Sequence, residues 1–109
     1  MHLLNLHPGG HSLQDIKTFI SQVENIMIAL SEDDMPTPTT LFRWFYHALK
    51  KVPMLHKIMD KVKESKKGSS KRTFKWIKSE VKKFIKEKKY DSNLDSISNL
   101  SAQADRKTN

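Results

Sequence analysis

The stretch Thr39–Val62, TTLFRWFYHALKKVPMLHKIMDKV, constrains the fold of this 109-residue chain more than any other. It is the densest apolar block in the sequence, and Pro53 divides it in two. When successive residues advance by about 100°, as in a helix, apolar side chains cover most of the surface of the first half. Such a helix must be covered by neighbours on most of its sides. The stretch therefore predicts a central helix with Phe45 in the middle of its apolar side.

Three further segments have helical periodicity. In the first, Leu13–Leu30, apolar residues repeat at spacings of three and four. Ser12 precedes this segment and Asp15 lies in its first turn, an arrangement that resembles a helix cap. Narrower apolar stripes favour two more helices, one at Pro53–Ser65 and one at Arg72–Lys89. The sequence predicts an all-α fold, a small four-helix bundle with helices at Leu13–Leu30, Thr39–Val52, Pro53–Ser65 and Arg72–Lys89.

The two ends of the chain differ from this helical part in composition. Residues 1–11 contain His7-Pro8-Gly9-Gly10, which is typical of a turn, and we expect a flexible leader there. Residues 12–90 form the predicted helical domain. Residues 91–109 are rich in serine and asparagine, and this composition predicts a disordered polar tail.

The sequence favours a protein that is not an enzyme. It has no cysteine, no glycine-rich phosphate loop and no nucleophile elbow, so we expect no catalytic residue, no cofactor and no small-molecule substrate. His7 and His11 have the spacing of a helical metal pair, but the Pro-Gly-Gly between them prevents a regular turn, and we expect no metal site. Asp33 and Asp34 are expected to face water beside a helix start.

No segment predicts insertion into a membrane. No apolar run reaches the roughly 18 residues that a membrane span needs. The N-terminal residues MHLLNLHPGGHS lack the basic region of a signal peptide. We therefore expect an intracellular, cytoplasmic protein.

The net charge of +8 is concentrated in the second half of the chain. Residues 50–89 contain sixteen Lys and Arg against four Asp and Glu, whereas residues 1–49 contain two against five. This asymmetry indicates a polyanionic partner such as RNA.

The last predicted helix has a lysine-rich side, on which Trp76 aligns with Lys83 and Tyr90 at intervals of seven. The simplest interpretation is that these lysines only face water and that Trp76 packs against a loop or against the helix predicted at Pro53–Ser65. Lysines with interleaved aromatic residues also bind nucleic acids, and basic amphipathic helices bind membranes or calmodulin-like grooves. The last two uses require a free apolar side, which the domain needs for its own core. The candidate nucleic-acid-binding residues are Lys75, Trp76, Lys82, Lys83, Lys86 and Lys89.

Two tryptophans are candidates for self-association. Trp44 and Trp76 both lie off the centre of the apolar stripes of their helices. We expect them to be exposed and to contact a second copy in a homo-oligomer.

Two aromatic segments, LFRWFYH at Leu41–His47 and RTFKWI at Arg72–Ile77, together with Lys50, Pro53 and Asp60-Lys61, carry a resemblance to a known family. From about Asp15 to Ile85 the chain resembles the capsid-like Gag segment of copia-type retrotransposons of the protist type. The resemblance implies an all-helical module that self-associates into a shell around element RNA. The family's downstream zinc-binding segment needs cysteines that this chain lacks, so a fragment or decayed copy is expected.

The sequence thus predicts a non-enzymatic, Gag-like structural module that self-associates and contacts RNA through its lysine-rich helical side. The alternative is a stand-alone basic helical domain that binds DNA or RNA. A shell component oligomerises, whereas a stand-alone binder stays monomeric or dimeric.

Overall fold

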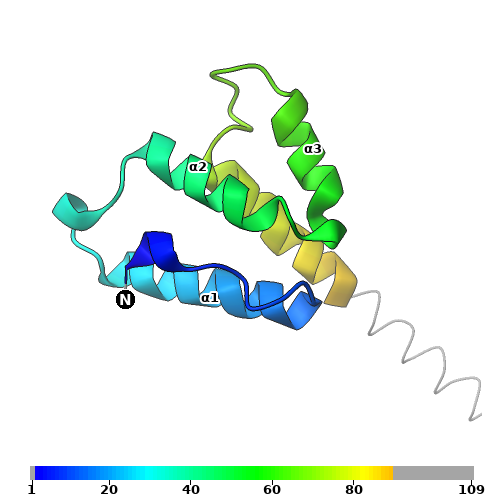
Figure 1. Ribbon diagram of the computed structural model, residues 1–109, viewed down its shortest axis with the longest axis horizontal. Coiled ribbons are helices and arrows are strands. Elements are labelled where there is room, and N and C mark those ends of the chain that lie inside the picture. The colour runs from blue at the N-terminus through cyan, green and yellow to red at the C-terminus, as the bar shows by residue number, and fades with distance from the viewer. Residues whose placement is uncertain (1, 90–109) are drawn as a thin grey trace, which may run out of the picture.

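The computed structural model describes residues 2–89, and in this part of the chain it contains four α-helices and no strand (Figure 1). The predicted all-α class is confirmed. Tyr90 and the predicted tail, residues 91–109, lie outside the described residues. The α-helices are α1 (Leu13–Ala29), α2 (Pro38–Leu49), α3 (His56–Glu64) and a fourth helix at residues 74–89, drawn in yellow, and the 3-10 turns are η1 (Leu3–Asn5), η2 (Glu32–Asp34) and η3 (Pro53–Leu55).

Hydroxyl side chains cap the starts of α1 and α2. At α1 the Ser12 hydroxyl accepts a hydrogen bond from the Asp15 amide at 3.1 Å, and the Asp15 carboxylate accepts one from the Ser12 amide at 3.2 Å. This is the capping box that the sequence suggests. At α2 the Thr37 hydroxyl accepts from the Thr40 amide, and Pro38 occupies the first helical position. Both helix starts are therefore defined by their local sequence.

The predicted helix boundary at Val52 differs from the observed one. α2 ends at Leu49, Lys50 and Lys51 form a turn, and Val52 is extended, with φ −87° and ψ 110°. The ring of Pro53 crowds the residue before it and excludes Val52 from the helical region. The chain then continues through η3 before α3 begins, so the segment predicted as one helix from Pro53 starts as a 3-10 turn.

The fourth helix begins after Thr73 rather than at Arg72. The Thr73 hydroxyl accepts a hydrogen bond from the Trp76 amide at 3.2 Å and donates one to the Ser70 carbonyl at 2.8 Å. Ser69 and Ser70 precede this cap and belong to the loop that follows α3. A threonine N-cap therefore sets the start of the basic helix.

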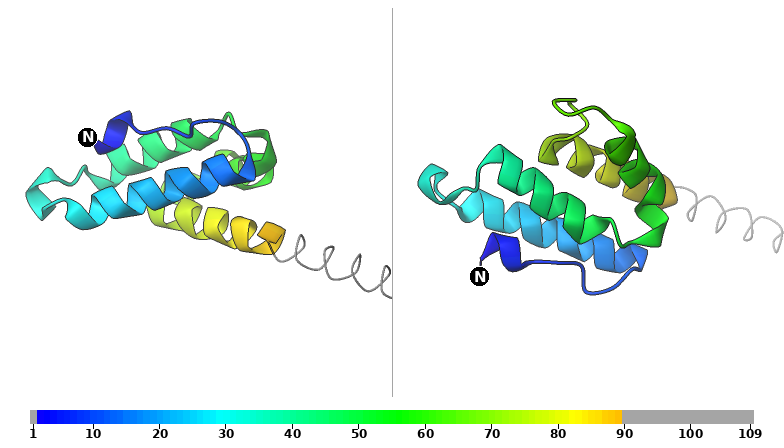
Figure 2. Two further views of the ribbon diagram at one scale, coloured as in Figure 1. Left: turned by 90° about the horizontal axis from the view of Figure 1, so that it is seen from below. Right: turned by 45° about the horizontal axis from the view of Figure 1, so that its top comes forward.

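α1 and α2 lie side by side and run in opposite directions (Figures 1 and 2). The left view of Figure 2 shows the N-terminal segment on one side of this pair and the fourth helix on the other. α3 lies across one end, and the loop of residues 65–73 returns from it to the start of the fourth helix.

The core forms where these elements meet, and Phe45 is at its centre. Its side chain is completely buried, and its ring centroid lies 5.9 Å from that of Phe19 on α1 and 4.6 Å from that of Phe74 on the fourth helix. The predicted central position of Phe45 is confirmed. The buried hydrophobic residues are Leu3, Leu6, Ile16, Phe19, Ile20, Val23, Leu41, Phe45, Leu49, Val52, Leu55, Ile58, Met59, Val62, Ile77 and Val81.

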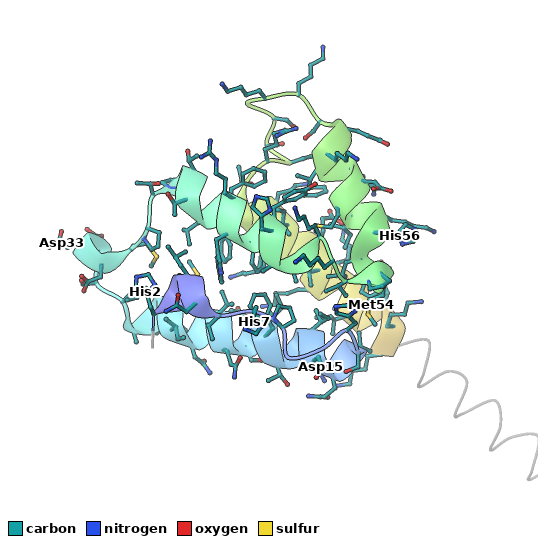
Figure 3. All side chains as sticks on the ribbon, viewed as in Figure 1. His2, His7, Asp15, Asp33, Met54 and His56 are labelled. Atoms are coloured by element: carbon teal, nitrogen blue, oxygen red, sulfur yellow. The ribbon has the colours of Figure 1, made fainter. Side chains whose placement is uncertain are left out.

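The N-terminal segment is folded onto the helices, which corrects the expectation of a flexible leader at residues 1–11. Leu3 and Leu6 belong to the core, and the Leu6 carbonyl accepts a hydrogen bond from the Trp44 indole at 3.1 Å. The chain turns at Pro8-Gly9-Gly10 before it enters α1, so the segment before the turn lies beside that helix (Figure 3, between His7 and Asp15). The composition of this turn is typical of disorder, but the two leucines before it are buried in the core and hold the segment in place.

Among the helices of residues 2–89, none has both the length and the apolar character needed to cross a membrane.

Candidate nucleic-acid interface

The fourth helix directs one side into the core and the other to solvent. Ile77 and Val81 are fully buried, and Phe74, Phe84 and Ile85 pack against the core. The apolar side of this helix is therefore occupied within the domain. A membrane surface or a calmodulin-like groove would need that side exposed, so the helix is not available for either in this fold.

Five of the predicted site residues lie on the solvent side of the fourth helix, and all five are exposed. We call this set the lysine side. A single rigid helix carries them, so they can act together on an extended polyanion. Its residues are Lys75, Lys82, Lys83, Lys86 and Lys89.

Two members of the lysine side have acidic partners within the protein. The Lys82 Nζ lies 3.0 Å and 3.3 Å from the two carboxylate oxygens of Glu24 on α1, and Lys78 Nζ lies 3.6 Å from the same carboxylate. Lys83 lies 3.9 Å from Glu80, one helical turn away. Within residues 2–89, no carboxylate lies at ion-pair distance from Lys75, Lys86 or Lys89. These three are therefore the lysines best placed to meet a phosphate.

The ion pair also lowers the pKa of Glu24. The hydrogen bond from Lys82 holds the pKa of Glu24 below its ordinary value of 4.5, with further contributions from the charges of Lys78 and Lys82. A carboxyl group with a lowered pKa in the folded state stabilises the protein fully above its unfolded pKa. That contribution is lost as the pH falls through the folded value. Because about half of the Lys82 side chain is exposed to water, the pair adds at most about 1 kcal/mol and can yield to a phosphate.

The two tryptophans are less exposed than the predicted role in self-association implies. Trp44 is half-buried, its indole N–H donates to the Leu6 carbonyl, and its ring lies 6.0 Å from Phe19 and 5.6 Å from Phe45 between centroids. Trp44 therefore contributes to the packing of a single copy of the chain, and its role in self-association stays a prediction. Trp76 is also half-buried and packs against the edge of the core.

A groove of about 770 Å³ lies between the start of α2, the loop after α3 and the start of the fourth helix. Two half-buried aromatic rings, Phe42 and Phe74, line it, and no Asp or Glu is among its lining residues. We call it the basic groove, because its lining includes the cationic side chains of Arg43, Lys67, Arg72 and Lys75.

The loop that forms one wall of the basic groove is held by its own hydrogen bonds. Arg72 Nε donates to the Ser65 carbonyl at 3.1 Å, at the end of α3. Gly68 has φ +88°, a left-handed conformation that side chains other than glycine rarely adopt. Arg72 therefore serves the loop, while Arg43, Lys67 and Lys75 are exposed and available to a ligand.

Sequence reasoning found the lysine side and missed the groove. Arg43 lies on α2 and Lys67 lies in the loop after α3, so the two residues are far apart in the sequence. The meeting of these two residues depends on where α3 returns the chain, which no local spacing reveals. The concentration of basic residues in positions 50–89 was the only signal in the sequence.

Three histidines line a smaller cavity of about 240 Å³ beside the N-terminal segment, namely His7, His11 and His47. Within residues 2–89, no three histidine or carboxylate side chains are arranged to hold a metal ion. Imidazoles gathered in this way do not make a metal site by number alone.

Comparison with family models, with curated proteins and with solved structures found no match to this chain.

Proposed function

We propose that the chain is a non-enzymatic helical module that binds RNA through its lysine side and associates with copies of itself. One observation carries the first part. The fourth helix buries its apolar side in the core, which fixes Lys75, Lys86 and Lys89 outward on a rigid element without acidic partners among residues 2–89. A row of exposed ammonium groups attracts the phosphates of a nucleic acid, which release counterions when they are neutralised.

Salt dependence tests this proposal. Each lysine that neutralises a phosphate of a single strand lowers log K by about 0.7 per tenfold rise in salt. Three such lysines give a slope of about −2, and all five of the lysine side give about −3.5. Fluorescence anisotropy of a labelled RNA across a salt series measures the slope. A slope near zero would contradict the proposal.

A matched pair of charge reversals locates the binding surface. Lys86→Glu with Lys89→Glu should weaken binding to every RNA sequence alike, because phosphates are common to all. Lys57→Glu with Lys61→Glu changes the net charge by the same amount on the exposed side of α3 and should have a smaller effect. Equal losses from the two double variants would mean that only overall charge matters.

The second part of the proposal is Gag-like self-association, as in the capsid segment of copia-type retrotransposons. The two aromatic segments that carry the resemblance meet in the core, where Phe45 contacts Phe74. Both segments therefore contribute rings to the same core, as expected of segments that specify a fold. Trp76, at the edge of the core, is the remaining aromatic candidate for a contact between copies.

We expect the average mass in sedimentation equilibrium to rise with concentration, and Trp76→Ala to reduce that rise. Trp44→Phe is the control, because it keeps the apolar contacts of a ring that already serves a single copy. A strictly monomeric protein in low and high salt would favour the alternative, a stand-alone basic domain that binds DNA or RNA.

A further inference from the structure

The basic groove and the lysine side are continuous, because Lys75 belongs to both. Lys75 is in the first turn of the fourth helix, and the other members of the lysine side follow it along the same helix. A strand that follows these lysines toward the start of the helix arrives at the groove. The groove is therefore on the path of the proposed RNA.

The groove differs from the lysine side in offering aromatic rings. The ring of Phe74 packs against Phe45, with centroids 4.6 Å apart and ring planes tilted by 57°, and Lys78 Nζ lies 5.7 Å from its centroid. The ring centroid of Phe42 lies 6.1 Å from that of Tyr46. Both rings are half-buried, so each keeps an exposed part while its orientation is set by packing. A fixed ring loses little conformational freedom when a flat ligand stacks on it.

Charge and size agree with a nucleotide. Arg43 and Lys67 are exposed at the groove beside the aromatic rings, and no carboxylate among the lining residues opposes an anion. The volume of about 770 Å³ is within the range of about 300–1,000 Å³ that small-ligand sites occupy. An acidic peptide without aromatic residues would neutralise the cations and leave the aromatic rings without a flat partner. A nucleotide uses both features.

We propose that the basic groove holds a nucleotide of a bound single strand, with its base against Phe42 and Phe74 and its phosphate beside Arg43 and Lys67. This inference rests on the proposed RNA binding and adds a site at which the base itself contributes. The contribution is tolerant of sequence, because every base has a flat face.

The test compares a labelled uridylate oligomer of about ten nucleotides with an abasic ribose-phosphate chain of equal length. The full chain should bind the uridylate roughly five- to 150-fold more tightly, as expected for a stacked base. Phe42→Leu keeps an apolar side chain but removes one of the two rings, and should reduce this preference by lowering the affinity for the uridylate more than the affinity for the abasic chain. Lys86→Glu with Lys89→Glu should weaken both ligands and keep the preference.

A second variant avoids the aromatic residues. Arg43→Glu with Lys67→Glu alters only exposed side chains, and should weaken uridylate binding more than the α3 control Lys57→Glu with Lys61→Glu. Thermal melts check that each variant is folded.

Three results would overturn the inference. Equal affinity of the wild-type chain for both ligands, with sensitivity to Lys86 and Lys89, would leave the lysine side as the binding surface and remove the nucleotide from the groove. Displacement of the label by an acidic peptide, without any base preference, would make the groove a peptide site. Absence of binding to either ligand at low salt would refute the proposed RNA binding itself.

Discussion

Phe45→Ala should destabilise the protein by about 3–5 kcal/mol, a cost typical of removing a buried phenylalanine ring. Phe45 is completely buried and contacts rings from α1 and from the fourth helix, so the cavity would open where three helices meet. For a domain of this size the melting temperature should fall by at least about 12 °C. Urea denaturation followed by circular dichroism measures the free energy directly.

Arg43→Ala is the control for this prediction, because Arg43 is on the same helix and exposed. Its effect should stay within about 0.5 kcal/mol. If Phe45→Ala costs less than about 1 kcal/mol, Phe45 is not the centre of the core.

Leu3→Ala should cost about 2–5 kcal/mol, although Leu3 is close to the start of the chain. Only 2% of its surface is exposed, and it belongs to the same buried cluster as Phe19 and Phe45. Truncation leaves a cavity beneath a short segment and loosens its attachment to the helices. Thermal and urea melts measure the loss.

Asn5→Ala is the matched control, since Asn5 lies in the same turn and is exposed. It should change stability by less than about 0.5 kcal/mol. A flexible leader, as the composition of residues 1–11 suggests, would make Leu3→Ala equally silent. The two variants therefore decide between a docked segment and a leader.

The helices were predictable because their apolar residues repeat at the helical period. Leu13–Leu30 and Thr39–Val52 each match an observed helix that starts within a residue of the prediction. Helix ends were less predictable, and Val52 shows why. Its side chain fits the apolar stripe, but Pro53 acts on its backbone and ends the helix earlier. The apolar stripe predicts which side chains are buried, whereas the backbone conformation of Val52 is set by the proline that follows it.

The lysine side was predictable for the same reason as the helices, because burial of the apolar stripe forces the lysines outward. The partner of Lys82 was not, since Glu24 is on a different helix and meets it only after α1 and the fourth helix pack together. Arg43 and Lys67 meet at the groove through a similar tertiary arrangement. Properties within one helix follow from spacing, whereas contacts between elements depend on how the helices pack.

The docked N-terminal segment has a consequence for the order of events during synthesis. Leu6 is made before α1 and α2, and Trp44, which donates a hydrogen bond to its carbonyl, is made 38 residues later. At about 5–20 residues per second, the segment waits some seconds for its partner. The attachment of this segment, which includes the hydrogen bond from Trp44 to Leu6, therefore cannot be completed until α2 has been made.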